Sequence, residues 1–201
     1  MALNFANNNS LSAITTKPSG LSGGALNLIS TQTASSSSTI SFTSGIDDTY
    51  DSYVFKFIDI HSSADDKLFM VNFSTDSGSN YNVTKTTTFF EVQHAENDSY
   101  TALQYNSGAD LAQSTGDMRL MFSLGTDNDQ SCAGSMQLFN PSSSVFVKHF
   151  ISTCTVYHNA DLASQAYVAG YNNTTNPING VRFQMNSGNI DSGVIKLYGV
   201  S

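Results

Sequence analysis

The feature that most constrains this chain is the segment 45–61, GIDDTYDSYVFKFIDIH. It begins with an aspartate-rich turn and continues as a run of aromatic and β-branched residues, which favour a pleated, packed surface. Its alternate residues form two apolar sets, one for each face of a strand: Tyr53, Phe55 and Phe57, and Val54, Ile58 and Ile60. We therefore predict a central strand with partners on both sides and with both faces covered.

The rest of the chain repeats this kind of pattern in shorter pieces. About ten apolar stretches follow one another at spacings typical of a sandwich, with Gly, Asn, Asp or Pro at nearly every turn. The clearest alternation is MRLMFSL at 118–124, and no stretch has the periodicity of an amphipathic helix. The prediction is an all-β domain over residues 27–201, an antiparallel β-sandwich of jelly-roll type.

Four local assignments follow from the same patterns. The serine run 35–38 is predicted to be a solvated turn or linker after a short edge strand at 25–32. Residues 81–83 are predicted to be strand, and residues 145–157 one long strand. Residues 158–165 are predicted to be a polar connection.

Residues 1–26 have a different character, with Asn, Ser and Gly around isolated apolar residues. We interpret them as an N-terminal arm. Two interpretations explain this composition equally well. The segment is either a frayed terminus or an extended arm that becomes ordered on a neighbouring subunit. In the second case Phe5, Leu11 and Ile14 would be the partner-binding anchors.

Composition narrows the classes of function. Only 12% of the 201 residues are charged, and the formal net charge is -8. Low charge density lowers the desolvation cost of packing against identical neighbours, although an ordinary turn-rich β domain has the same composition. Because no Lys/Arg cluster occurs, we expect no nucleic-acid partner. Without a secretory signal pattern or an apolar run of about 20 residues, we expect synthesis in the cytoplasm and no membrane span.

The reactive residue types show no catalytic or metal-binding spacing, so we expect no enzyme activity, no metal and no cofactor. Cys132 and Cys154 could form a cross-strand disulfide, but two buried thiols fit a protein without a signal sequence better. Aspartates gather in predicted turns, where local hydrogen bonding is commoner than calcium binding. Glu91 and Asp59 are the only carboxylate pair to inspect for glycoside hydrolysis. The four histidines are scattered: His61, His94, His149 and His158.

Late in the chain, tyrosines and asparagines suggest a second kind of site. Tyr157, Tyr171, Asn172 and Asn173 fall in predicted loops or strand ends. A tyrosine combines an apolar ring with a polar tip, and an amide both donates and accepts hydrogen bonds. These four residues are therefore a candidate glycan-binding loop, although the absence of Trp weakens it.

Several strand-turn blocks agree in order with one known family. The blocks are residues 37–61, NYNVTKTTTFF at 80–90, LFNPSSSVFVKHF at 138–150, and the segment 168–200. In these blocks the chain resembles a family of virion structural proteins of marine tailed bacteriophages that infect cyanobacteria and abundant ocean bacteria. The resemblance covers roughly residues 26–200. It implies a particle component and carries over no catalytic residue.

On these grounds we expect a capsid decoration or cement protein on the head exterior of a virion, made in the host cytoplasm. Its partners would be further copies of itself, as a homotrimer, and the major capsid protein. The alternative is a tail-fibre or receptor-binding subunit that recognises host-surface glycan. A polysaccharide-degrading enzyme is a third class.

Overall fold

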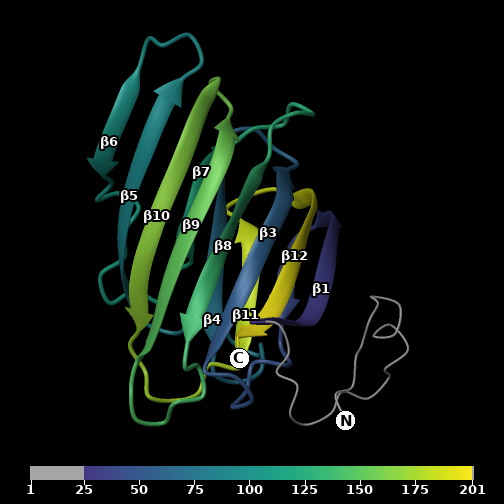
Figure 1. The fold of residues 1–201 in the computed structure, drawn as a ribbon, viewed down its shortest axis with the longest axis vertical. Helices are drawn as coiled ribbons and strands as arrows, with labels where there is room; N and C mark the ends of the chain where they lie inside the picture. The colour runs from purple at the N-terminus through teal and green to yellow at the C-terminus, as the bar shows by residue number, and fades with distance from the viewer. Residues whose placement is uncertain (1–24, 201) are drawn as a thin grey trace, which may run out of the picture.

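The computed structural model describes residues 25–200, which form twelve strands and contain no helix (Figure 1). None of these residues therefore forms a helix that could span a membrane. The predicted arm anchors Phe5, Leu11 and Ile14 lie outside the described residues. In chain order the strands are β1 (Leu26–Ser37), β2 (Ile40–Phe42), β3 (Ser52–Ser62), β4 (Lys67–Ser74), β5 (Lys85–Ala95), β6 (Thr101–Tyr105), β7 (Met118–Leu124), β8 (Cys132–Phe139), β9 (Lys148–His158), β10 (Leu162–Asn172), β11 (Gly180–Met185) and β12 (Ile190–Val200).

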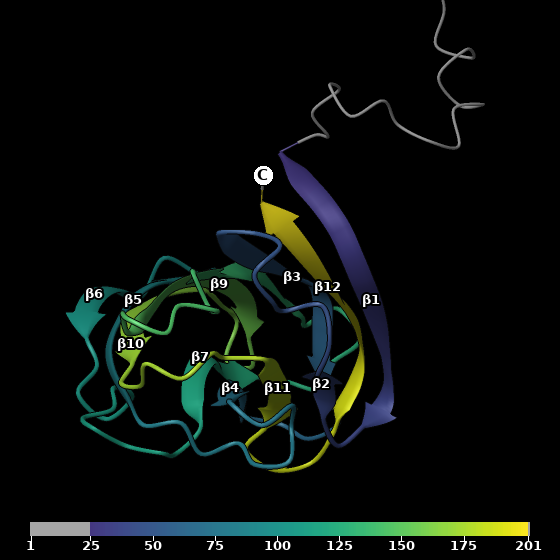
Figure 2. The ribbon, with the colours of Figure 1, turned by 90° about the horizontal axis from the view of Figure 1, so that it is seen from below.

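The strands are arranged in two layers of one continuous antiparallel sheet. The front layer has the order β1-β12-β3-β8-β9-β10-β5-β6, and the back layer has the order β7-β4-β11-β2. The two layers connect where β7 and β9 pair, at Leu124 and His158. Figure 2 shows the back layer lying against the inner side of the front layer. The predicted all-β antiparallel sandwich is confirmed, and the jelly-roll connectivity stays a prediction.

Strand β3 is central, as predicted, because it pairs with β12 on one side and β8 on the other. Tyr53, Phe55 and Phe57 are buried in the core. The prediction that both faces are covered is wrong, since Ile58 on the opposite face is 40% exposed. Asp59 explains why Ile60 does not share the exposure of Ile58. Its φ of 50° interrupts the pairing with β8 after Phe57, so the ladder resumes at Ile60, which is buried.

A cluster of phenylalanine rings joins the two layers. Phe183 of β11 lies at its centre, with its ring centroid 5.2 to 6.2 Å from the centroids of four neighbouring rings. These neighbours come from β2, β3 and β4: Phe42, Phe55, Phe57 and Phe69. Most of the pairs are edge-to-face, an arrangement that adds to the free energy gained by burying the rings.

The predicted turn at 35–38 is wrong for most of its length. Ser35 and Ser37 belong to β1 and pair with Ser192 and Ile190 of β12. Serine has no strong preference between strand and turn, and the hydrogen-bond partners for its backbone come from β12.

Three other local assignments are also corrected. Residues 81–83 lie outside the strands. Strand β9 begins only at Lys148, because the Ser143 hydroxyl accepts hydrogen bonds from the backbone N–H groups of Val145 and Phe146 and holds them in a turn. Strand β10 begins at Leu162, because a tight turn with Asp161 at φ 58° replaces the expected long connection.

The ring cluster yields a stability prediction. We expect Phe183→Ala to lower the free energy of unfolding by about 3 to 5 kcal/mol, because the substitution leaves a cavity among four rings. Phe146→Ala removes the same atoms from a side chain that is 69% exposed, and we expect a change within about 0.5 kcal/mol. Urea unfolding of both variants measures the difference, and equal losses would show that Phe183 does not hold the layers together.

Candidate functional site

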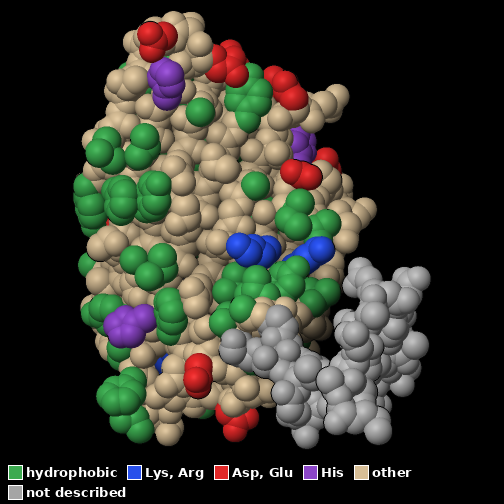
Figure 3. All heavy atoms as spheres, in the orientation of Figure 1, with side chains coloured by type: hydrophobic (Ala, Val, Ile, Leu, Met, Phe, Trp, Pro, Cys, Tyr) green, Lys and Arg blue, Asp and Glu red, His purple; other side chains and the backbone are tan. Residues whose placement is uncertain are grey.

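The outer face of the front layer spans eight strands and points away from the back layer. Register pairing places one residue from each strand in a row across it, in the order Thr31, Lys196, Lys56, Ser135, Thr153, Tyr167, Phe90 and Tyr105. This row contains no carboxylate. In Figure 3 the acidic side chains lie toward the upper and lower rims of this face, while basic side chains lie beside a hydrophobic cluster.

Many of the exposed large apolar side chains lie on this outer face. They include Leu26 and Leu28 of β1, Phe90 of β5, Leu103 of β6 and Ile151 of β9. Phe90 also stacks on Tyr167 of the adjacent strand, with ring centroids 4.7 Å apart and an interplanar angle of 7°. Apolar side chains that stay exposed on one face make that face a candidate contact surface.

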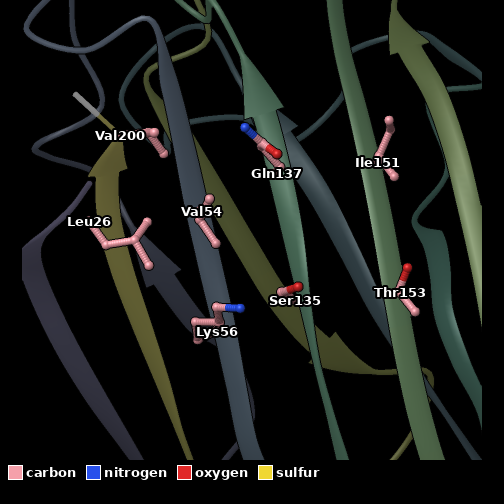
Figure 4. A pocket seen from close by; sticks show the side chains of 8 residues that line it. All are labelled: Leu26, Val54, Lys56, Ser135, Gln137, Ile151, Thr153 and Val200. Carbon is pink, nitrogen blue, oxygen red and sulfur yellow. The ribbon is translucent and has the colours of Figure 1, made fainter. Parts of the chain in front are cut away.

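A shallow groove of about 390 Å³ crosses the outer face above β8. Figure 4 shows Ser135 and Gln137 of β8 between Val54 and Lys56 of β3 on one side and Ile151 of β9 on the other. Because the Ser135 side chain is short, it leaves a hollow, and the longer side chains of the neighbouring strands form its walls. The groove therefore offers apolar walls, three neutral polar side chains and one ammonium.

Lys56 and Lys196 lie side by side, since they are register partners on β3 and β12. Within residues 25–200 the ion pairs involve other residues, and neither of these two lysines has a carboxylate in salt-bridge range. Two adjacent positive charges on a chain of net charge -8 favour a partner that carries carboxylates.

A second groove of about 450 Å³ lies on the same face over β10. Ala169 leaves room between Ile151 and His149 on β9 and Thr88 on β5, and Tyr171 closes one end. Its lining is mostly apolar, which suits the flat face of a ligand ring better than a charged group.

The structure brings together only part of the candidate glycan-binding loop. Gln113 donates a hydrogen bond to the Tyr171 hydroxyl at 3.3 Å and accepts one from the Asn173 amide at 2.7 Å. Asn172 points inward and is fully buried. Tyr157 pairs with Ala163 toward the far end of the β9–β10 hairpin, about 26 Å along the strand from Tyr171.

Behind the outer face, Asn172 lies between two buried lysines, since it pairs in register with Lys85 on β5 and with Lys148 on β9. The Lys85 ammonium donates to the carbonyl oxygens of Val83 and Gly116, at 2.9 and 2.7 Å. Burial lowers the pKa of Lys85 to about 8, and the nearby Asp117 carboxylate partly opposes this shift. Because all three side chains are closed to solvent, they support the fold and do not contribute to a contact surface.

The candidate carboxylate pair is not assembled. Glu91 is buried and points inward, where it accepts hydrogen bonds from the amides of Gln104 at 2.6 Å and Asn106 at 3.4 Å. Asp59 is exposed on β3, and β8, β9 and β10 separate the two strands. Among residues 25–200, no three His, Cys, Asp or Glu side chains converge as a metal site would require.

The two cysteines are buried free thiols on neighbouring strands, which confirms the prediction made from the absence of a signal sequence. A hydrogen bond with the Cys154 thiol, together with burial, raises the pKa of Cys132 well above its usual value. A thiol held protonated in the core is a poor nucleophile.

No family model, curated protein or solved structure matches this chain. The candidate site is therefore the outer face. Sequence reasoning missed its central residues, although Lys56 carried a signal: a single lysine within the apolar run VFKFI indicates an outward-facing position.

The buried Lys85 yields a prediction for stability against pH. Its pKa is about 8 in the folded state against 10.5 for the free group, so the unfolded chain binds more protons between these values. The free energy of unfolding should therefore rise with pH across this window, by at most about 3 kcal/mol, and Lys85→Met should lack that rise. Urea unfolding between pH 7 and about 10.5 measures it. Lys67→Met, at a partly exposed lysine, is the control, and parallel curves for wild type and Lys85→Met would contradict the assignment.

Proposed function

We propose that this chain is a non-catalytic structural subunit of a bacteriophage virion, a decoration or cement protein that attaches to the head exterior through the outer face. The observation that carries the proposal is this broad, carboxylate-free row of side chains with exposed apolar residues and two unpaired lysines. The resemblance to virion proteins of marine phages is the reason for proposing a phage particle.

The composition of the outer face suits attachment to a repeating shell. Ser, Thr, Gln and Ala cost little to desolvate compared with charged groups, and the apolar residues gain free energy when they are covered. Lys56 and Lys196 favour a position on the shell where carboxylates face them. This preference fixes the orientation in which the subunit attaches. Binding only to the assembled shell would stabilise that shell by mass action. The partners in this proposal are the major capsid protein and further copies of the chain.

Purified virions test this function directly. We expect the chain in copy numbers comparable with the major capsid protein and distributed over the head, measured by quantitative mass spectrometry and labelled electron microscopy. We expect Lys56→Glu to weaken attachment at least about tenfold, because it places a carboxylate where the partner is expected to carry one.

Lys67→Glu is the matched control for this experiment, since it makes the same change of charge on β4, in the back layer. It should bind as the wild type does. A copy number restricted to the tail, or equal binding by both variants, would contradict attachment to the head through the outer face.

A second candidate is a tail-fibre or receptor-binding subunit that recognises host-surface glycan. It is favoured by the groove over Ala169, where Tyr171 stands beside the hydrogen-bonded pair of Gln113 and Asn173. An apolar surface next to amide groups offers a sugar ring both a stacking contact and hydrogen bonds.

Tyrosine substitution on the two ends of the β9–β10 hairpin tests the glycan candidate. If a glycan binds at this groove, Tyr171→Ala should lower affinity at least about tenfold, while Tyr157→Ala, about 26 Å away, should leave it unchanged. A glycan array identifies a ligand and titration calorimetry measures both variants. Absence of any glycan binding, or equal losses, would remove this candidate.

A further inference from the structure

Strand β6 (Thr101–Tyr105) forms one margin of the front layer, and in the described part of the chain it pairs only with β5 (Figure 1). Its sequence, TALQY, contains no charged residue and no proline. Natural edge strands usually carry such residues to prevent pairing with another chain. An edge that lacks them is suited to accept a further strand.

The direction of the free backbone groups follows from the register with β5. The Ala95 N–H donates to the Tyr100 carbonyl, and the Asn106 N–H donates to the Phe89 carbonyl. In an antiparallel ladder every second residue faces the same neighbour, so residues 100, 102, 104 and 106 bond to β5. Thr101, Leu103 and Tyr105 therefore direct their N–H and C=O groups outward.

Side chains give this edge an apolar centre. Leu103, the middle residue of β6, is 73% exposed, more than any other large apolar side chain of residues 25–200. Its register partner on β5 is Val92, which is 37% exposed. Near the two ends of the strand, the Asp98 carboxylate lies 3.0 Å from the His94 ring and the Asp110 carboxylate accepts a hydrogen bond from the Tyr105 hydroxyl.

We propose that two copies of this chain pair antiparallel through β6, with Leu103 on the two-fold axis, in place of the homotrimer expected from the sequence. Thr101 then lies opposite the partner's Tyr105, and Leu103 lies opposite the partner's Leu103. In this register the outward N–H and C=O groups of the three residues bond to those of the second copy, about six hydrogen bonds in all. The two leucines and the two Val92 side chains form one apolar strip across the junction.

Self-pairing fits this edge better than pairing with a foreign strand. On a chain of net charge -8, the uncharged strand β6 can lie against its own copy without opposing like charges along its length. Symmetry also matches every outward donor with an acceptor of the same strand. The axis stands perpendicular to the sheet, so both outer faces point in one direction. This pairing is independent of what the outer face binds.

Oligomeric mass in solution tests the proposal with the full chain. By sedimentation velocity at micromolar concentration we expect a dimer for the wild type and a monomer for Leu103→Lys, because that variant places two like charges on the axis. Phe146→Lys makes a similar change at another exposed apolar residue, at 69% exposure, and should remain a dimer. Circular dichroism should be the same for all three proteins. A wild-type monomer, a trimer, or a dimeric Leu103→Lys would overturn the proposal.

Cross-linking provides a second readout. Directly opposed residues in this register have Cα atoms about 5.5 Å apart, within the range that a disulfide can bridge. Leu103→Cys should therefore give a covalent dimer under mild oxidation, whereas the wild type should not, since Cys132 and Cys154 are buried. A double variant in the N-terminal arm, Phe5→Asp with Leu11→Asp, should stay dimeric. Its conversion to monomer would assign the β6 edge to the arm of another copy and overturn the two-fold pairing.

Discussion

The packing of Phe183 against rings of the front layer determines which side of that layer faces the core. Once Phe55 and Phe57 are held against Phe183, the alternation of β3 turns Val54 and Lys56 outward. Because neighbouring strands pair in register, the same choice propagates across the layer to β1 on one side and β6 on the other. The outer face is thus a consequence of core packing.

The sequence predicted this core well and its faces less well. The run from Tyr53 to Phe57 identified both a strand and its central place, because aromatic residues at alternate positions need neighbours on both sides. The exposure of Ile58 could not be read from the pattern. The burial of Ile60 could not be read from it either, because the positive φ of Asp59 interrupts the alternation and turns Ile60 inward. Ser35 and Ser37 similarly take their strand conformation from β12.

In the candidate sites, too, the sequence indicated local features but not which distant residues come together. Tyr157 and Tyr171 looked like neighbours because both lie in one stretch rich in Tyr and Asn. A hairpin strand places them at opposite ends, since each residue adds about 3.3 Å of length. Gln113, which contacts both Tyr171 and Asn173, comes from a loop far away in sequence. Lys196 reaches Lys56 only through the register of β12 on β3.

The distribution of charge links the outer face to the open edge. Most carboxylates of the front layer lie in turns or at strand ends, Glu91 lies inside the core, and Asp59 lies at the irregularity of β3. The row of register partners through Lys56 and the strand β6 both lack negative charge. Pairing through β6 would double the outer face and would place two Lys56–Lys196 pairs on the same side. Each copy would then bind its partner surface through a weak contact that carries little charge. Once one copy is bound, binding of the second copy of the same dimer is intramolecular. A shell with repeating acidic positions is the kind of surface on which such a dimer gains most over a single copy.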